Sequence, residues 1–158
     1  MIIVSDASPI IFLLKLKRLD FLSSLYKAKI LLPEEVHAEI CKKLENHELS
    51  YLKSFENLFE TVAVEGSLNI AKLHEGENKA ILLAKNRKAD FILIDDKHAR
   101  IICEQIGLKV MGTIGLLYSA LQEKIIAKKE FIQFIDDLIQ KHNFRVSIEL
   151  YNRIKSQF

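Results

Sequence analysis

The strongest constraint on the fold is a series of short apolar runs that do not alternate with polar residues. These runs lie at 2–4, 29–32, 91–94 and 108–111, and the second and fourth each include one lysine, Lys29 and Lys109. A strand with apolar side chains at successive positions is buried on both faces, so the runs predict a parallel sheet covered by helices on both sides. Segments with helical patterning separate the runs. The sequence therefore predicts an α/β sandwich.

Size and composition are those of one globular domain. The 158 residues are 49% hydrophobic and include only five glycines and two prolines, without a linker or low-complexity segment. We expect a single domain over 1–158, with a core over about 1–127 and a helical extension over 128–158. The chain shows neither a membrane-spanning run nor a signal peptide, which predicts a cytoplasmic protein without membrane contact.

The cysteines and histidines do not suggest chemistry. Cys41 and Cys103 have neither metal-ligand spacing nor the context of a disulfide-rich protein, so two free thiols are expected. The five histidines form no zinc-binding pattern and are interpreted as surface or helix residues.

Acidic residues stand where the predicted strands end and where helices begin. Asp6 follows the first strand, Asp95 and Asp96 follow the strand at 91–94, and Glu39 and Glu77 lie in helices. In an open parallel sheet the carboxyl ends of the strands and the adjoining helix starts meet in one crevice. We therefore expect the acids to share one site.

Each acid also has an ordinary structural explanation. Asp6 fits a turn, Glu39 a surface position, and Glu77 a first-turn acid stabilised by the helix dipole. Asp95 and Asp96 fit a turn and an N-cap, but one cap accounts for only one of them. We assign the cap to Asp96 and the site role to Asp95.

A second acid pair has a simpler interpretation. Asp136 and Asp137 fall opposite the apolar stripe of the helix predicted after residue 128. A solvated helix face explains both residues, so they are set aside.

Four carboxylates in one crevice imply a cation. Like charges at short range raise one another's pKa values and destabilise the fold unless a cation compensates. Oxygen ligands without Cys or His favour Mg²⁺ or Mn²⁺, which activate water and bind phosphate oxygens in phosphodiester cleavage. Setting these four of the 21 acids aside leaves 17 against 23 lysines and arginines, an excess of six positive charges. That balance suits a polyanionic substrate.

Basic residues after the first helix's apolar run and near the acids are candidate phosphate contacts. A solvated surface is the ordinary alternative for each of them. The candidates are Lys15, Lys17, Arg18, Lys42, Lys43, Lys97 and Arg100.

Five segments, in their order and spacing, resemble the PIN-domain family, in a branch similar to the VapC-type toxins. The resemblance covers nearly the whole chain, and any one segment alone would be weak. The segments are VSDASPII at 4–11, LLPEEVHAEI at 31–40, LHEGENKAILLA at 73–84, LIDDKHAR at 93–100 and GLKVMGTIGLLYSAL at 107–121.

The resemblance implies a Mg²⁺- or Mn²⁺-dependent endoribonuclease built on a Rossmann-like sheet, with RNA as its substrate. By analogy with small toxins, a homodimer and an antitoxin partner are expected. Ala7 stands where the family often has Thr or Ser, while Ser8 remains as a supporting hydroxyl. By motif match the catalytic acids are Asp6, Glu39, Glu77 and Asp95, with Asp96 as a neighbouring fifth metal ligand.

Two other functions remain in competition. The first is a catalytically weak or inactive PIN-fold module that binds nucleic acid or a partner protein. The second is a response-regulator receiver, which also carries carboxylates at strand ends. A receiver has its acid pair after the first strand, whereas this chain has only Asp6 there and its pair at 95–96.

Overall fold

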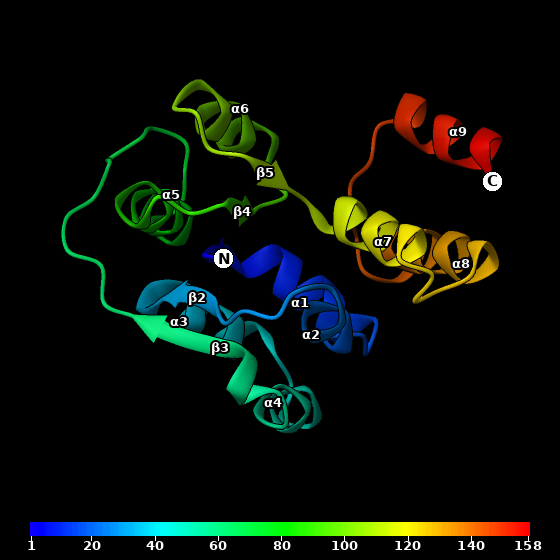
Figure 1. The fold of residues 1–158 in the computed structure, drawn as a ribbon, viewed down its shortest axis with the longest axis horizontal. Coiled ribbons are helices and arrows are strands. Elements are labelled where there is room, and N and C mark those ends of the chain that lie inside the picture. The colour runs from blue at the N-terminus through cyan, green and yellow to red at the C-terminus, as the bar shows by residue number, and fades with distance from the viewer.

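A computed structural model describes all residues, 1–158, as a five-stranded parallel sheet surrounded by helices (Figure 1). The strands are β1 (Ile3–Ser5), β2 (Ile30–Pro33), β3 (Phe59–Val62), β4 (Phe91–Leu93) and β5 (Val110–Met111). The helices are α1 (Ala7–Lys15), α2 (Asp20–Leu25), α3 (Glu34–Lys43), α4 (Asn46–Lys53), α5 (Glu75–Arg87), α6 (Lys97–Gln105), α7 (Thr113–Gln122), α8 (Lys128–Lys141) and α9 (Ile148–Gln157), with a 3₁₀ turn at Glu56–Leu58. None of these helices has the length and apolar character needed to cross a bilayer.

The central strands are buried on both faces. All residues of β1 and β2 are buried, as are Ile92 and Leu93 of β4. Because successive side chains of a strand point to opposite faces, both faces of the sheet must be covered. The predicted α/β fold with a Rossmann-like parallel sheet is confirmed.

The strand order β3-β2-β1-β4-β5 places a topological switch point between β1 and β4. From β1 the chain builds outward to β2 and β3, and then returns to the other side of β1 for β4 and β5. Ser5 pairs with Leu93, and the Asp6 backbone N–H donates to the Leu93 carbonyl at 2.9 Å. The residues that follow β1 and β4 therefore emerge side by side, where open α/β sheets bind their ligands.

Three helix boundaries differ from what local patterns in the sequence predict, namely an N-cap at Ser8 before Pro9, a helix over 44–58 and a helix from about residue 67. The first helix begins at Ala7, so Asp6 rather than Ser8 holds the N-cap position. The helix expected over 44–58 is shorter, because it ends at Lys53 and only a 3₁₀ turn follows. The helix expected from about residue 67 begins at Glu75.

The late start of α5 has a local cause. Asn69 and Lys72 have positive φ angles, which a helix does not allow. The buried Asn78 side chain then ties this turn to the helix: its oxygen accepts from the Ile70 N–H at 3.0 Å, and its amide donates to the His74 carbonyl at 3.2 Å. Asn78 thus fixes where the chain enters α5.

The C-terminal extension packs on the rest of the protein through α8, which lies beside α7 (Figure 1). Phe131, Ile135 and Leu138 are buried, as their spacing predicts. The interpretation of Asp136 as a solvated residue is wrong. Its carboxylate accepts hydrogen bonds from the Tyr151 hydroxyl at 3.0 Å and the Lys155 ammonium at 2.9 Å. Asp136 therefore fastens α9 to α8.

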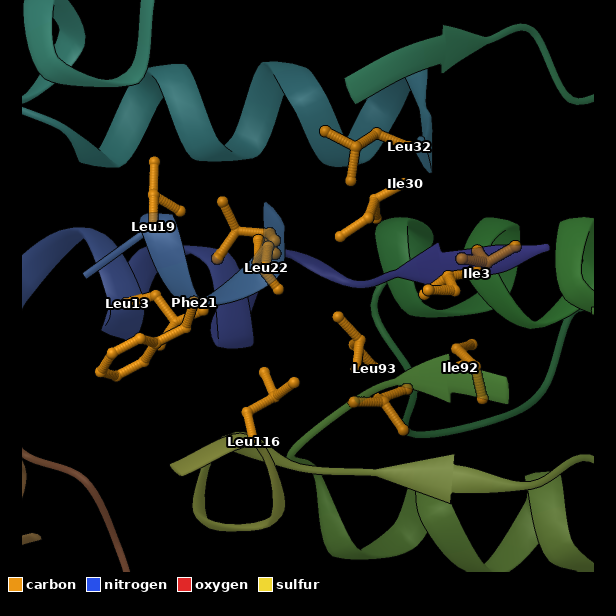
Figure 2. Packing of buried hydrophobic residues seen from close by; sticks show 14 of the residues in the cluster. Ile3, Leu13, Leu19, Phe21, Leu22, Ile30, Leu32, Ile92, Leu93 and Leu116 are labelled. Carbon is orange, nitrogen blue, oxygen red and sulfur yellow. The ribbon is translucent and has the colours of Figure 1, made fainter. Parts of the chain in front are cut away.

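One hydrophobic cluster of 33 buried residues joins the sheet to its helices. Ile154 of α9 belongs to it, so the extension shares the same core as the strands. Figure 2 shows side chains from β1, β2 and β4 converging with those of α1, α2 and α7, among them Ile3, Leu13, Phe21, Leu22, Leu32, Ile92, Leu93 and Leu116.

Asn78→Ala should destabilise the protein by about 1–3 kcal/mol, because backbone groups of the turn before α5 would lose their buried partner. Urea denaturation measures the change. Asn86→Ala is the matched control, since Asn86 is exposed on the same helix and should change the free energy of unfolding by less than about 0.5 kcal/mol. Equal effects of the two substitutions would contradict the role of Asn78.

Candidate active site

A cavity of about 680 Å³ opens at the carboxyl ends of β1 and β4. All five predicted acids line it, together with Ser8. We call it the acid cavity. Its walls come from α1, α3, α5, the start of α6 and the segment 143–147 between α8 and α9. The acidic lining residues are Asp6, Glu39, Glu77, Asp95 and Asp96.

Asp6 is the most deeply buried of these acids, with an exposed fraction of 4%. Its Oδ1 atom is buried and has no hydrogen-bond partner. Burial raises the pKa of Asp6 to about 7; the Ala7 backbone opposes this rise, whereas the carboxylates of Glu77, Glu39 and Asp95 add to it. A buried oxygen without a partner costs free energy, so a cation or a proton at this atom would stabilise the fold.

Asp95 is bound by the first residue of α7. Its Oδ1 accepts from the Thr113 backbone N–H and its Oδ2 from the Thr113 hydroxyl, both at 2.7 Å. Burial raises the pKa of Asp95, while these hydrogen bonds and the charge of Arg100 lower it in part. Each carboxylate oxygen has a second lone pair, so Asp95 can still accept from a ligand.

Asp96 is the N-cap of α6, as the sequence predicted. Its Oδ1 accepts from the Ala99 N–H at 2.8 Å, while its side chain is exposed at the cavity. Asp95 and Asp96 therefore lie in different surroundings, although they are neighbours in the sequence. The first residue lies half-buried against α7, and the second caps α6.

Glu77 combines the two roles considered for it. One oxygen, Oε2, accepts from the His74 N–H at 3.0 Å and so caps α5. Burial raises the pKa of Glu77, and the charges of Asp96 and Glu39 raise it further, against the lowering effect of His74. A carboxylate used only for capping would not need to face other carboxylates.

Glu39 reaches the cavity from α3 and pairs with Lys43 one turn later, at 2.7 Å. Gly76 in α5 permits this approach. A β-carbon at Gly76 would lie 3.0 Å from Glu39 Oε2 and 3.8 Å from Asp6 Oδ1. The absence of a side chain at Gly76 therefore leaves space where the two carboxylates meet.

The five acids are close but not gathered around one point. The one His, Cys, Asp and Glu group whose donor atoms all lie within 4.8 Å of one another is a different one, Glu45, His47 and Glu48. Glu48 is already paired with Lys15 at 2.7 Å, in a separate cavity. Because Lys15 already compensates the charge of Glu48, this second group has less need of a cation. No pattern in the sequence indicated the group.

The acid cavity nevertheless fits a hard divalent cation. Its donors are carboxylate oxygens, one of them is buried without a partner, and burial raises three of the carboxyl pKa values. Asp6, Glu39, Glu77 and Asp95 would hold the ion, with Asp96 at the rim.

The predicted basic residues separate into two groups. Lys43 and Lys97 line the acid cavity, and the Arg100 guanidinium lies beside Gly112 near Asp95. Lys15, paired with Glu48, lies in the separate cavity, and Lys42 is an exposed residue of α3 outside the acid cavity.

Sequence analysis missed much of the cavity wall. His74 was interpreted only as a surface or helix residue. The segment 143–147 has no acidic residue and no helical periodicity, and lies about 50 residues beyond the last predicted acid, so no local signal marked it. The residues missed are Phe12, His74, Asn143, Phe144, Arg145, Val146 and Ser147.

Asp6→Asn should change how stability depends on pH in EDTA. Because the folded protein holds the Asp6 proton more tightly than the unfolded chain, Asp6 destabilises the wild type progressively as pH rises from about 4 to about 7. The Asn variant lacks this loss. Its free energy of unfolding, relative to that of the wild type, should therefore rise by on the order of 3 kcal/mol across that pH range. Urea denaturation at several pH values measures the difference, and parallel curves for both proteins would contradict it.

A protein-family model described as a PIN domain matches residues 2–158. Among solved structures, a PilT N-terminus domain protein from the hyperthermophilic archaeon Sulfolobus solfataricus P2 is 19% identical, with a TM-score of 0.48. The match covers 77% of this chain and 95% of that one. No curated protein matches the chain. The family match agrees with the five sequence segments and removes the receiver alternative, so the chain belongs to the PIN-domain family.

Proposed function

We propose that the protein is a Mg²⁺- or Mn²⁺-dependent endoribonuclease that cleaves RNA phosphodiester bonds with an activated water molecule. PIN domains are generally nucleases that act on nucleic acids and use divalent metals. The observation that carries the proposal is the acid cavity. Five carboxylates line it, from the residues that follow β1 and β4 and from helices α3 and α5, and the most buried of them has an oxygen without a partner.

The geometry suits a substrate with a phosphate backbone. Asp6, Glu39, Glu77 and Asp95 would hold a divalent cation, which would supply a more acidic water molecule and neutralise charge on the phosphate oxygens. Asp6 and Asp95 project from adjacent strand ends and are held by the sheet and by Thr113. Rigid supports of this kind keep catalytic groups at fixed positions.

Other groups of the chain would act on the substrate rather than on the cation. Lys97 is exposed at the cavity and is free to bind a phosphate, while Lys43 partly neutralises Glu39. Ser8 lines the cavity and offers a hydroxyl to a water molecule or to the RNA. Ala7, where the family often has a hydroxyl, is buried and offers none.

The biological role that we propose is that of a toxin-type nuclease, with a homodimer and an antitoxin protein as partners, in the cytoplasm. The resemblance of the five segments to VapC-type toxins supports this role. Two observations favour the alternative, an inactive PIN-fold module. The carboxylate oxygens are not gathered around one point, and Ala7 offers no hydroxyl where the family often has one. Activity measurements separate the two.

The purified protein should cleave single-stranded RNA in Mg²⁺ or Mn²⁺ and lose this activity in EDTA. Metal-activated water attacks phosphorus without using the ribose 2′-hydroxyl, so the products should carry 5′-phosphate and 3′-hydroxyl ends. Gel analysis of end-labelled RNA detects both results. Cleavage that persists in EDTA, or 2′,3′-cyclic phosphate ends, would contradict the mechanism.

Asp6→Asn should reduce cleavage at least about 100-fold, because it removes the buried carboxylate of the site. Asp137→Asn on α8 is the matched control, since Asp137 lies outside the cavity and should leave the rate unchanged. RNA binding without cleavage by the wild type, in either metal, would favour the inactive-module alternative.

Lys97→Ala should weaken RNA affinity and reduce its salt dependence, because a phosphate contact releases counterions from the RNA. Lys15→Ala should change neither, since Lys15 pairs with Glu48 in the separate cavity. Fluorescence anisotropy over a series of salt concentrations compares the two variants. A larger effect of Lys15→Ala would place the RNA at the separate cavity instead.

A further inference from the structure

The segment 143–147 forms a wall of the acid cavity that none of the predicted site residues belongs to. It joins α8 to α9, and all five of its residues line the cavity. A loop of the C-terminal extension therefore faces carboxylates that come from the first hundred residues. This wall carries one charged side chain, Arg145.

Arg145 and Lys97 differ from Lys43 and Arg100, the other cations near the acids, because neither has a partner in the protein. Lys43 is engaged by Glu39 at 2.7 Å, and Arg100 lies against Gly112 and Asp95. Arg145 is exposed and forms neither an ion pair nor a side-chain hydrogen bond with the protein, although carboxylates line the same cavity. Its five N–H donors are available to a ligand.

The backbone around Arg145 is fixed on both sides. Before it, the Phe144 ring packs edge-to-face on Phe12, with ring centroids 4.9 Å apart, and the Phe144 N–H donates to the Leu138 carbonyl at 3.0 Å. After it, the Ser147 hydroxyl accepts from the Leu150 N–H at 3.1 Å and caps α9. Arg145 is therefore presented from an anchored segment.

The anchor on the α9 side depends on Asp136. Its carboxylate holds both Tyr151 and Lys155, and Ile154 is the one residue of α9 that is buried. Apolar contacts also hold this helix, since Phe158 at its end packs on Phe131 of α8 with ring centroids 5.2 Å apart, and the polar contacts of Asp136 add to them. Asp136 thus positions the wall indirectly.

Charge explains why a nuclease would need this wall. Five carboxylates line the cavity against Lys43, Lys97 and Arg145, so a phosphate backbone approaching it meets excess negative charge. A guanidinium can donate to two phosphate oxygens at once, so it orients the phosphate as well as attracting it.

We propose that Arg145 binds a backbone phosphate of the single-stranded RNA substrate at the acid cavity, and that the contacts of Asp136 with α9 hold Arg145 in position. The inference rests on the nuclease function proposed above and adds a substrate-positioning residue to it. The C-terminal extension is then part of the substrate site.

Binding is measured by fluorescence anisotropy with a labelled single-stranded RNA of about 12 nucleotides, in an Asp6→Asn background that prevents cleavage. Adding Arg145→Ala should weaken affinity about 10-fold and reduce the slope of log affinity against log salt by about 0.7, the value for one phosphate contact on single-stranded nucleic acid. Arg145→Lys should keep the slope but recover only part of the affinity, because lysine retains the positive charge but cannot form the two parallel hydrogen bonds of a guanidinium.

Arg153→Ala is the matched control, because Arg153 is an exposed arginine of α9 outside the cavity. It should leave affinity and slope unchanged. If Arg145→Ala and Arg153→Ala give the same values, the role of Arg145 is overturned while the nuclease function stands. If the protein with neither arginine changed binds no RNA at any salt concentration, the proposed nuclease function fails as well.

The role of Asp136 is tested with a double-mutant cycle. Asp136→Ala should weaken RNA affinity when Arg145 is present and have no further effect when Arg145 is already alanine. With an intact Asp6, Asp136→Ala should raise KM for RNA several-fold at nearly constant kcat. Equal effects in both Arg145 backgrounds would overturn the positioning role.

Discussion

The repulsion among carboxylates at the switch point between β1 and β4 is the constraint on which the rest of the site depends. Parallel pairing of these strands places Asp6 and Asp95 at neighbouring strand ends, and the sheet leaves neither backbone free to move away. Local partners offset part of the cost: Thr113 for Asp95, Lys43 for Glu39 and the His74 N–H for Glu77. Among the acids of the cavity, only Asp6 keeps a buried oxygen without a partner.

These local partners also explain why the carboxylates are spread rather than gathered. Asp95, Glu39 and Glu77 each turn at least one oxygen toward a neighbouring donor, and one such hydrogen bond contributes only about 1 kcal/mol, or somewhat more when charged. A divalent cation competes with bonds of this size, and second lone pairs on the same oxygens remain available. The arrangement is therefore consistent with acids that are held apart by neighbouring donors and drawn together by a ligand of opposite charge.

Sequence reasoning succeeded where local pattern and fold geometry coincide. Unbroken apolar runs predicted the central strands, and parallel strands bring their carboxyl ends to one edge, which located Asp6 and Asp95 together. It failed where contacts between distant residues decide the outcome. The turn before α5 depends on Asn78 reaching back to Ile70, and Asp136 looks solvated until α9 folds against it. Periodicity cannot reveal such partners.

The acids and the segment 143–147, which face each other across the cavity, differ in the same way. The acids stand on strands and helices of the core, where substitution would disturb packing as well as charge. Arg145 stands on a loop whose position depends on one aromatic contact, one helix cap and the contacts of Asp136. Those contacts can change without altering the sheet, because they lie outside its strands. Under the proposed nuclease function, an acid set fixed by the fold, facing a wall fixed by a few local contacts, would let the choice of RNA change while the chemistry stays the same.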